Sequence, residues 1–304
     1  MKNGRHRQFA RYVAPLCITR GKGFRLADFD PADTAGLKSA DKAEAKEALA
    51  RGVEWLTEQQ DMLYAQDHWA VLLVFQAMDA AGKDSTIKHV TSGINPQGCS
   101  VTSFKQPSSE ELDHDYLWRY MRNVPARGQI GIFNRSYYEE VLVVKVHQEL
   151  LQRQKLHPSL VTRDIWKERY ADIVNYERYL VRNGVLVLKF FLHLSRGEQK
   201  RRFLERLDNP AKNWKFSTAD VAERAHWDEY QQAYEEAIRH TATPQAPWYV
   251  IPADNKWFTR LAVATAIVEA IGGLQLHYPV MGPAARRDLA RARAQLAAGR
   301  RAGR

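Results

Sequence analysis

A lysine, two aspartates and several small residues lie together in the segment Gln-Ala-Met-Asp-Ala-Ala-Gly-Lys-Asp-Ser-Thr, residues 76–86. The segment follows an apolar run that predicts a strand, and it leads into a stretch with helical spacing. Free backbone N–H groups at a helix start, the helix dipole and a lysine together favour phosphate oxygens. We therefore predict phosphate binding by Gly82, Lys83, Asp84 and Ser85. The alternative is a tight turn with a solvated lysine.

This segment departs from the common phosphate-loop pattern G-x-x-x-x-G-K-[ST] at two positions. Ala77 replaces the first glycine, and Asp84 replaces the hydroxyl residue after the lysine. Asp79 adds a carboxylate that would repel phosphate unless a metal ion or a transferable proton intervenes. Asp79 is therefore a candidate Mg²⁺ ligand or a group that orients the acceptor.

A second polar segment follows another apolar run, at Asn134 and Arg135. Ser136 and Glu139 have the spacing of a capping box, which predicts a helix start. Because ligands of open α/β sheets bind at the carboxyl ends of strands, Arg135 is expected to point at phosphate. The alternative is a surface arginine paired with Glu139 or Glu140.

Residues 201–239 combine basic and aromatic side chains, and we predict a helical lid at about 209–240. Ser217 and Asp220 have capping-box spacing. Four apolar residues three or four apart form a stripe that predicts packing, whereas the basic residues lie outside it. The stripe is Trp227, Tyr230, Tyr234 and Ile238, and the candidate phosphate ligands are Lys212, Lys215 and Arg224. A solvated basic face is the alternative.

Late in the chain, Asp254, Lys256 and Arg260 follow the last predicted strand. The strand end again indicates the ligand edge, so Lys256 and Arg260 are candidate phosphate ligands. A salt bridge between Asp254 and either basic residue is the alternative.

Five short runs rich in β-branched and aromatic residues alternate with helical stretches and predict the elements that position these residues. Several runs are apolar throughout, as in parallel strands covered on both faces. We predict a P-loop kinase-like, three-layer α/β/α fold with a parallel sheet of about five strands and a helical lid. The strands are expected at 70–76, 100–104, 129–133, 185–191 and 248–251.

The segment 39–63 predicts one long helix against the sheet edge, and 148–158 predicts a surface loop. The expected organisation is an N-terminal extension at 1–38, a P-loop domain at 39–282 and a basic, flexible tail at 283–304. The tail carries arginines 286, 287, 291, 293, 300, 301 and 304 against one acid, Asp288. We interpret it as solvated, with an auxiliary polyanion anchor as the alternative.

The composition points to a polyanionic partner, because 45 Lys and Arg stand against 35 Asp and Glu for a formal charge of +10. Cys17 and Cys99 have neither metal-type nor redox spacing, which favours a reducing compartment. No apolar run approaches the roughly 20 residues that span a bilayer. We therefore expect a cytoplasmic protein with no membrane partner.

Taken together, several segments resemble the polyphosphate kinase 2 family, and in particular its class III branch, which phosphorylates nucleoside monophosphates and diphosphates. The matching segments start at Phe75 (Phe-Gln-Ala-Met-Asp-Ala-Ala-Gly-Lys-Asp), Ile132 (Ile-Phe-Asn-Arg-Ser-Tyr-Tyr-Glu), Leu188 (Leu-Lys-Phe-Phe-Leu-His), Arg206 (Arg-Leu-Asp-Asn-Pro), Trp214 (Trp-Lys-Phe) and Ala246 (Ala-Pro-Trp-Tyr-Val-Ile-Pro-Ala).

The resemblance implies catalytic roles for Asp79 and Lys83 in the family's Walker A motif, for Arg135 in its Walker B motif and for Arg224 as its lid arginine. Many members have an aspartate that helps hold the metal where this chain has Asn134. The implied metal site, Asp79 with Asn134, therefore depends more on Asp79 and on substrate phosphates.

The implied reaction is transfer of the terminal phosphoryl group of inorganic polyphosphate to AMP and ADP, giving ADP and ATP, reversibly. The implied cofactor is Mg²⁺, with Mn²⁺ as an alternative, and the implied assembly is a homodimer or homotetramer. Two rival functions are an ATP-dependent P-loop kinase of a small metabolite and a non-enzymatic polyanion binder. We do not expect nucleic acid as a partner, because the aromatics form a helix stripe rather than an exposed stacking face.

Overall fold

A six-stranded sheet forms the centre of the computed structural model, which describes residues 10–211, 213–215 and 217–299. The strands lie in the order β1-β6-β5-β2-β4-β3, and all neighbours are parallel except β1 and β6. Their bounds are β1 Cys17–Ile18, β2 Ala70–Ala77, β3 Cys99–Ser103, β4 Ile130–Asn134, β5 Val185–His193 and β6 Trp248–Pro252. The predicted five parallel strands are confirmed, and the short antiparallel edge strand β1 is an addition.

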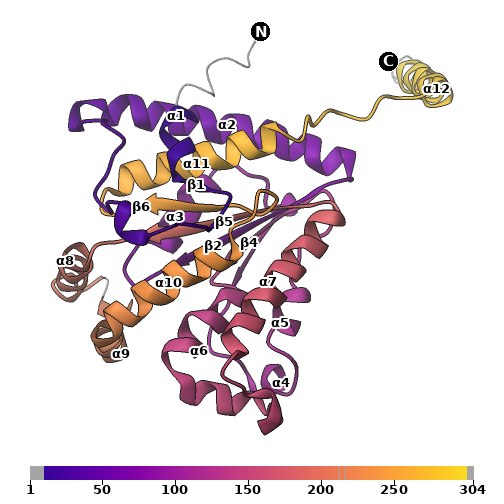
Figure 1. Cartoon of the computed structure of the whole chain (residues 1–304). Coiled ribbons are helices and arrows are strands. Elements are labelled where there is room, and N and C mark those ends of the chain that lie inside the picture. Colours follow the sequence, from indigo (N-terminus) through magenta and orange to yellow (C-terminus); the bar gives the residue numbers. More distant parts are fainter. Residues whose placement is uncertain (1–9, 212, 216, 300–304) are drawn as a thin grey trace.

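Both faces of the sheet are covered, as the apolar strands predicted. All 8 residues of β2 are buried. Leu72 and Val74 contribute to the hydrophobic core on one face, whereas Leu73 and Phe75 contribute to the core on the other. This alternation follows from the two-residue period of a strand and gives the three-layer arrangement in Figure 1.

One face is covered by α1 (Ala10–Val13), α2 (Lys42–Gln66), α3 (Lys83–Val90) and α11 (Lys256–Gly272). Figure 1 shows α2 beside α11 over the sheet. The prediction that this long helix packs at the sheet edge was therefore wrong, because Leu56 and Leu63 of α2 join the core with Val71. The helix also begins later than predicted, after the 3-10 turn η4 (Ser39–Asp41).

The opposite face is covered by α7 (Ile165–Arg182), α10 (Trp227–Thr241) and the 3-10 helix η6 (Tyr137–Val141). Lys189 of β5 is fully buried and donates to Glu177 Oε2 of α7 (2.6 Å) and to the Thr241 carbonyl oxygen of α10 (2.8 Å). These contacts fix both helices to the sheet. The aromatic stripe of α10 is buried as predicted, so this helix, which we had placed in the lid, is part of the core.

Shorter elements complete the chain between the layers. They are η2 (Ala14–Leu16), η3 (Leu26–Asp28), η5 (Pro96–Gly98), α4 (Ser109–Leu112), α5 (Trp118–Met121), α6 (Val143–Val146), η7 (Gln148–Gln154), η8 (Pro158–Leu160), α8 (Arg196–Leu207), η9 (Asn213–Lys215), α9 (Thr218–Glu223) and η10 (Arg224–His226). The predicted loop at 148–158 thus contains 3-10 turns, because Leu151 is buried and Gln154 donates to Glu140.

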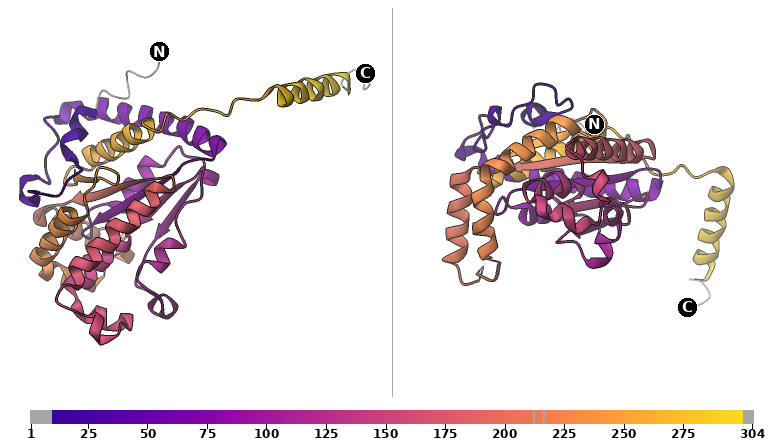
Figure 2. Two further views of the ribbon diagram at one scale, coloured as in Figure 1. Left: turned by 45° about the vertical axis from the view of Figure 1, so that its right-hand side comes forward. Right: turned by 60° about the horizontal axis from the view of Figure 1, so that its bottom comes forward.

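The described part of the basic C-terminal segment forms a helix, α12 (Pro283–Gly299), and Arg300, Arg301 and Arg304 lie outside the described residues. Figures 1 and 2 show it apart from the body of the molecule. Its alanine-rich composition explains the helix, since alanine has the highest helix propensity. No helix in the described parts of the chain is long and apolar enough to cross a membrane.

Candidate active site

The parallel register gathers the predicted site residues at one edge of the sheet. Phe75 of β2 pairs with Asn134 of β4, and Ala77 of β2 pairs with Leu192 of β5. Chain order reverses at β2, since the next two strands, β3 and β4, lie on one side of it and the last two, β5 and β6, lie on the other. Such a switch point is where open α/β sheets bind ligands.

The segment after β2 forms a tight loop before α3. Gly82 has φ 100° and Ala80 has φ 61°, both in the left-handed region, and the Thr86 N–H donates to the Gly82 carbonyl oxygen (2.9 Å). Lys83 Nζ donates to the Ala77 carbonyl oxygen (2.7 Å), so its ammonium group folds back over the loop. Burial lowers the pKa of Lys83, while the nearby Asp79 carboxylate opposes that shift. An anion in this loop would offset the same desolvation.

Arg135 contacts two carboxylates, those of Asp79 and Glu139. It has φ 67°, and its guanidinium lies 3.4 Å from Asp79 Oδ1 and 3.7 Å from Glu139 Oε2, with 42% of the side chain exposed. The alternative pairing with Glu139 is therefore present, and the contact with Asp79 places the guanidinium beside the phosphate loop. A contact between Arg135 and phosphate stays a prediction. Glu139 raises the pKa of Arg135 further, whereas burial raises the pKa of Glu139 itself.

The predicted capping box at this segment was wrong. The Ser136 hydroxyl accepts a hydrogen bond from the Tyr138 N–H, and the helix that follows is the 3-10 helix η6. Because Glu139 is paired with Arg135, its carboxylate belongs to the site rather than to the cap. Sequence reasoning treated Glu139 only as a cap and a pairing partner and so missed this position.

Asn134 is held by its neighbours at the end of β4. Its Nδ2 donates to Asp84 Oδ1 (2.8 Å) and lies 3.4 Å from Ser103 Oγ. The side-chain Oδ1 of Asn134 is the remaining acceptor of this amide. Within the described residues no group of three or more His, Cys, Asp or Glu side chains could hold a metal ion by itself.

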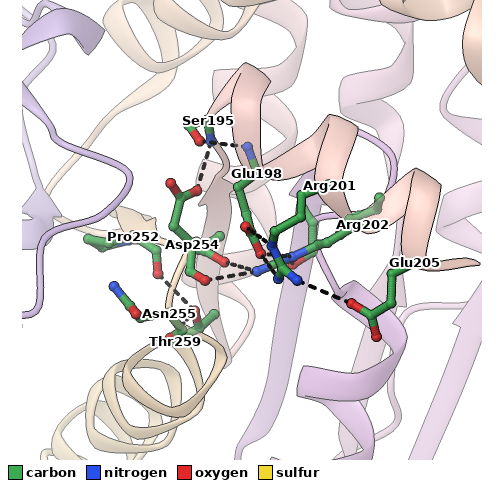
Figure 3. Close-up of polar contacts among 12 residues, drawn as sticks. Ser195, Glu198, Arg201, Arg202, Glu205, Pro252, Asp254, Asn255 and Thr259 are labelled. Carbon is green, nitrogen blue, oxygen red and sulfur yellow. Dashed lines mark hydrogen bonds and ion pairs between the residues drawn. The ribbon is translucent and has the colours of Figure 1, made fainter. Parts of the chain in front are cut away.

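Arg202 of α8 ties the phosphate loop to the segment after β6, and sequence analysis did not find it. Its guanidinium donates to the carbonyl oxygens of Ala80 (3.1 Å), Ala81 (2.9 Å), Ala253 (2.6 Å) and Asp254 (3.1 Å). Figure 3 shows Arg202 between Glu198 and Asp254, and Arg202 Nε donates to Glu198 Oε1 (2.7 Å). The one signal in the sequence is the Glu-to-Arg spacing of four residues.

The residues after β6 are placed differently from the predicted alternative. Asp254 Oδ1 accepts from the Ser195 N–H (2.9 Å), and the ion pairs of the described residues do not join it to Lys256 or Arg260. Arg260 Nη2 lies 3.5 Å from Ser85 Oγ, which brings α11 against α3. Burial lowers the pKa of Lys256, and the nearby Arg202 adds to that shift.

Arg224 approaches the loop indirectly. Its Nη1 donates to Gln199 Oε1 (2.7 Å) and to the Arg196 carbonyl oxygen (3.1 Å), and Gln199 Nε2 donates to the Asp79 carbonyl oxygen (3.0 Å). Asp220 pairs with Arg206 (3.4 Å) instead of completing the predicted capping box, whose serine caps the Ala219 N–H.

The side chains of two further basic candidates, Lys212 and Lys215, are not described. Lys212 lies outside the described residues, and Lys215 is described only as the last backbone position of η9. Their predicted contacts with phosphate stay predictions.

A cavity of about 420 Å³ opens beside Arg135 and Glu139. Its walls come from the segment after β3, from α6 and from η7, and they combine basic, acidic and aromatic side chains. The lining residues include Lys105, Tyr116, Arg119, Tyr120 and Val143.

Comparisons with known proteins agree with this geometry. A family model described as polyphosphate kinase 2 matches residues 39–277. The chain is 52% identical over 251 residues to ADP-polyphosphate phosphotransferase of Rhodopseudomonas palustris, covering 82% of this chain and 87% of that one. It is 48% identical over 256 residues to AMP/ADP-polyphosphate phosphotransferase of Meiothermus ruber, covering 84% and 91%. The crystal structure of polyphosphate kinase 2 from Arthrobacter aurescens TC1 superposes with a TM-score of 0.81 at 41% identity, covering 90% of this chain and 94% of that one.

Proposed function

The chain belongs to the polyphosphate kinase 2 family, and from this premise we propose that it transfers the terminal phosphoryl group of inorganic polyphosphate to ADP and AMP. The observation that carries the proposal is the position of Arg135. It lies 3.4 Å from Asp79 of the phosphate loop on one side and lines the 420 Å³ cavity on the other. A donor in the loop and an acceptor in the cavity would therefore meet at one guanidinium.

The loop supplies the donor site. Backbone N–H groups at the start of α3 and the Lys83 ammonium face the place where a terminal phosphoryl group would bind. When phosphate enters, Lys83 exchanges its contact with the Ala77 carbonyl oxygen for a phosphate oxygen. Such an exchange strengthens the contact, because the ammonium then meets a charged phosphate oxygen in place of a neutral carbonyl oxygen.

The cavity supplies the acceptor site. Its volume is within the range of about 300–1,000 Å³ that is typical of small-molecule pockets. Lys105, Arg119 and Arg135 offer positive charge for the nucleotide phosphates, although Arg119 is paired with Glu111 (3.1 Å) and Arg135 with Glu139 (3.7 Å). Tyr116, Tyr120 and Val143 provide apolar surface for the nucleoside. Glutamates also line the cavity, so the apolar surface beside Arg135, rather than a net positive charge, is what favours a nucleotide.

The metal site fits Mg²⁺, with Mn²⁺ as a substitute, only when substrate is bound. Mg²⁺ is usually held by one or two carboxylates together with substrate phosphates and water. Asp79 and Asn134, through its side-chain Oδ1, are the residues that would hold it, and the described residues offer no larger ligand cluster. When bound, the ion would neutralise charge on the reacting phosphates.

The chain's own residues promote transfer by position and charge. A terminal phosphate oxygen of the nucleotide attacks the end phosphorus of polyphosphate, forming the new O–P bond as the bridging P–O bond breaks. The electron pair leaves on the shortened polyphosphate. Lys83 and Arg135 stabilise the charge that develops on the transferred group, and Arg224 joins them when α9 closes over the loop. No covalent enzyme intermediate is required.

Asn134 supports AMP as an acceptor. It donates to Asp84 at 2.8 Å, a contact that an aspartate in its place could not make, because two carboxylates would repel each other. The neutral amide removes one negative charge beside the acceptor and so favours approach of phosphates with different charge. The alternative is a turn residue at the strand end with no effect on acceptor choice.

Two assays test the proposal. Polyphosphate, Mg²⁺ and ADP should give ATP, and a chain that makes ATP only from another phosphate donor would contradict the donor assignment. AMP with polyphosphate should give ADP and then ATP without added adenylate kinase. If ADP is accepted and AMP is inert, the argument from Asn134 is wrong. Assembly as a homodimer or homotetramer and a cytoplasmic location stay predictions.

A further inference from the structure

We propose that a second basic cavity, between α2, α3 and α11, binds the distal phosphates of the polyphosphate chain whose terminal group occupies the loop. The proposal rests on the proposed function. This distal pocket has a volume of about 640 Å³ and is separate from the acceptor cavity, since the two share no lining residue. Because only a long chain could reach this pocket, the enzyme should bind long polyphosphate more tightly than short polyphosphate.

The charged residues that line the distal pocket are all basic. Lys42 and Lys46 of α2, His89 of α3 and Arg260 of α11 line it, and no aspartate or glutamate does. The two lysines are four residues apart and therefore lie on the same face of α2, one turn from each other. The remaining surface is mostly small or apolar, including Ala45, Leu49 and Trp257, so the charged groups that line the pocket are all basic.

Ser85 lies between the phosphate loop and two residues that line the distal pocket. Arg260 Nη2 lies 3.5 Å from Ser85 Oγ, and His89 Nδ1 donates to the Ser85 carbonyl oxygen (2.6 Å). A Cβ atom added to Gly82 would meet the Ser85 hydroxyl at 3.7 Å, so Ser85 also faces the loop. One residue thus forms the boundary between the loop and the wall of the pocket.

Arg260 is the basic group whose surroundings favour an anion. Its Nε is buried and has no hydrogen-bond partner, and no ion pair of the described residues includes Arg260. Burial lowers the pKa of Arg260, which shows that its charge is partly removed from water. A phosphate beside it would supply the missing acceptor and the opposite charge.

A polymeric donor needs a path away from the reacting end. The acceptor cavity lies on the β3 and β4 side of Arg135, so an acceptor would occupy that direction. On the α3 and α11 side, Ser85, Arg260, His89 and the two lysines form a basic path of several residues. A chain too short to reach α2 would gain nothing from the lysines.

The test compares donors of two lengths in the double variant Lys42→Gln/Lys46→Gln. Two lost exposed ion pairs should raise KM for long-chain polyphosphate by about tenfold. The values of kcat, of KM for ADP and of KM for tetrapolyphosphate should stay within about twofold of wild type. High salt should shrink the wild-type advantage of the long donor, because exposed charges are screened.

The matched control is Lys22→Gln/Lys167→Gln. Both lysines are exposed and neither lines the distal pocket, so this variant loses the same formal charge elsewhere. An equal rise in KM for both double variants would mean a general charge effect and would overturn the proposal. An unchanged KM for the long donor in Lys42→Gln/Lys46→Gln, or an equal rise for tetrapolyphosphate, would also overturn it.

A binding measurement separates this proposal from the proposed function. Long-chain polyphosphate is titrated calorimetrically into wild type and both double variants without nucleotide. If wild type forms no ATP from polyphosphate and ADP but the pocket variant alone binds polyphosphate about tenfold more weakly, the distal pocket stands and the phosphotransferase assignment fails. If ATP forms and binding is equal in all three proteins, the distal pocket is wrong and the assignment stands.

Discussion

Replacing Arg202 by methionine should disable the phosphate loop and destabilise the fold together. The side chain is 5% exposed and donates to four backbone carbonyl oxygens, two in the loop and two after β6. Methionine keeps much of the volume but provides no donor. The variant therefore leaves buried carbonyl oxygens without partners and releases the loop from the segment after β6.

The size of the effect follows from burial. A hydrogen bond to a charged group contributes about 1.5–3 kcal/mol, and removal of one partner from a buried charged network costs about 3–5 kcal/mol. We expect a loss of about 4 kcal/mol in the free energy of unfolding and a fall in Tm of roughly 10 °C. A loop displaced by about 1 Å would lower turnover by about 100-fold.

The adjacent Arg201 provides the control. Its side chain is 60% exposed and pairs with Glu198 (2.6 Å) and Glu205 (3.4 Å), and such surface pairs contribute about 0–1 kcal/mol. Urea unfolding and kcat are measured for Arg202→Met and Arg201→Met in parallel. If the two variants unfold within about 1 kcal/mol of each other and both keep wild-type turnover, the stated role of Arg202 is wrong.

Three further perturbations test the site. Lys83→Ala and Asp79→Asn should each lower kcat by about 100- to 1,000-fold without unfolding the protein, and a folded Lys83→Ala variant with near-normal turnover would refute the loop assignment. Arg224→Ala should lower kcat more than it weakens nucleotide binding, whereas deletion of everything after Pro283 should change neither; the reverse pattern would place the polyanion contacts on α12. Burial lowers the pKa of His193 from 6.5 to about 4, so the unfolded chain binds a proton that the folded chain does not, and stability falls as pH falls through this window. In urea unfolding between pH 7 and pH 5, wild type should lose about 2 kcal/mol more than His193→Gln, and parallel curves would contradict this.

The fold could be predicted where a residue pattern repeats over several residues. The strands β2 and β5 are mostly apolar because both sheet faces are covered, and the stripe of α10 has the spacing of a packed helix. The strand β1 has 2 residues, too few to show a period. The position of α2 over a face depended on which helix it would meet, and local spacing does not specify that.

The site could be predicted only in part, for a related reason. Asp79, Lys83, Asn134 and Arg135 follow strand ends, so parallel topology brings them together. Arg202 donates to backbone carbonyl oxygens that are distant in sequence. Every residue has such an oxygen, so the side-chain types do not reveal which ones Arg202 contacts. The capping-box patterns misled because Glu139 and Asp220 found stronger partners, Arg135 and Arg206, once the chain folded.

The carboxylate of Asp79, which is unusual in a phosphate loop, is explained by its neighbours rather than by its own segment. Arg135 lies 3.4 Å from its carboxylate, and Gln199, which also accepts from Arg224, donates to its carbonyl oxygen at 3.0 Å. Asp79 therefore connects two parts of the site. Through Arg135 it meets the proposed acceptor cavity, and through Gln199 it is linked to Arg224 of the predicted lid. A phosphate entering the loop competes with this carboxylate for Arg135, since both are anions. Movement of Arg135 toward phosphate would leave Asp79 free for a metal ion, so donor binding and metal binding should strengthen each other.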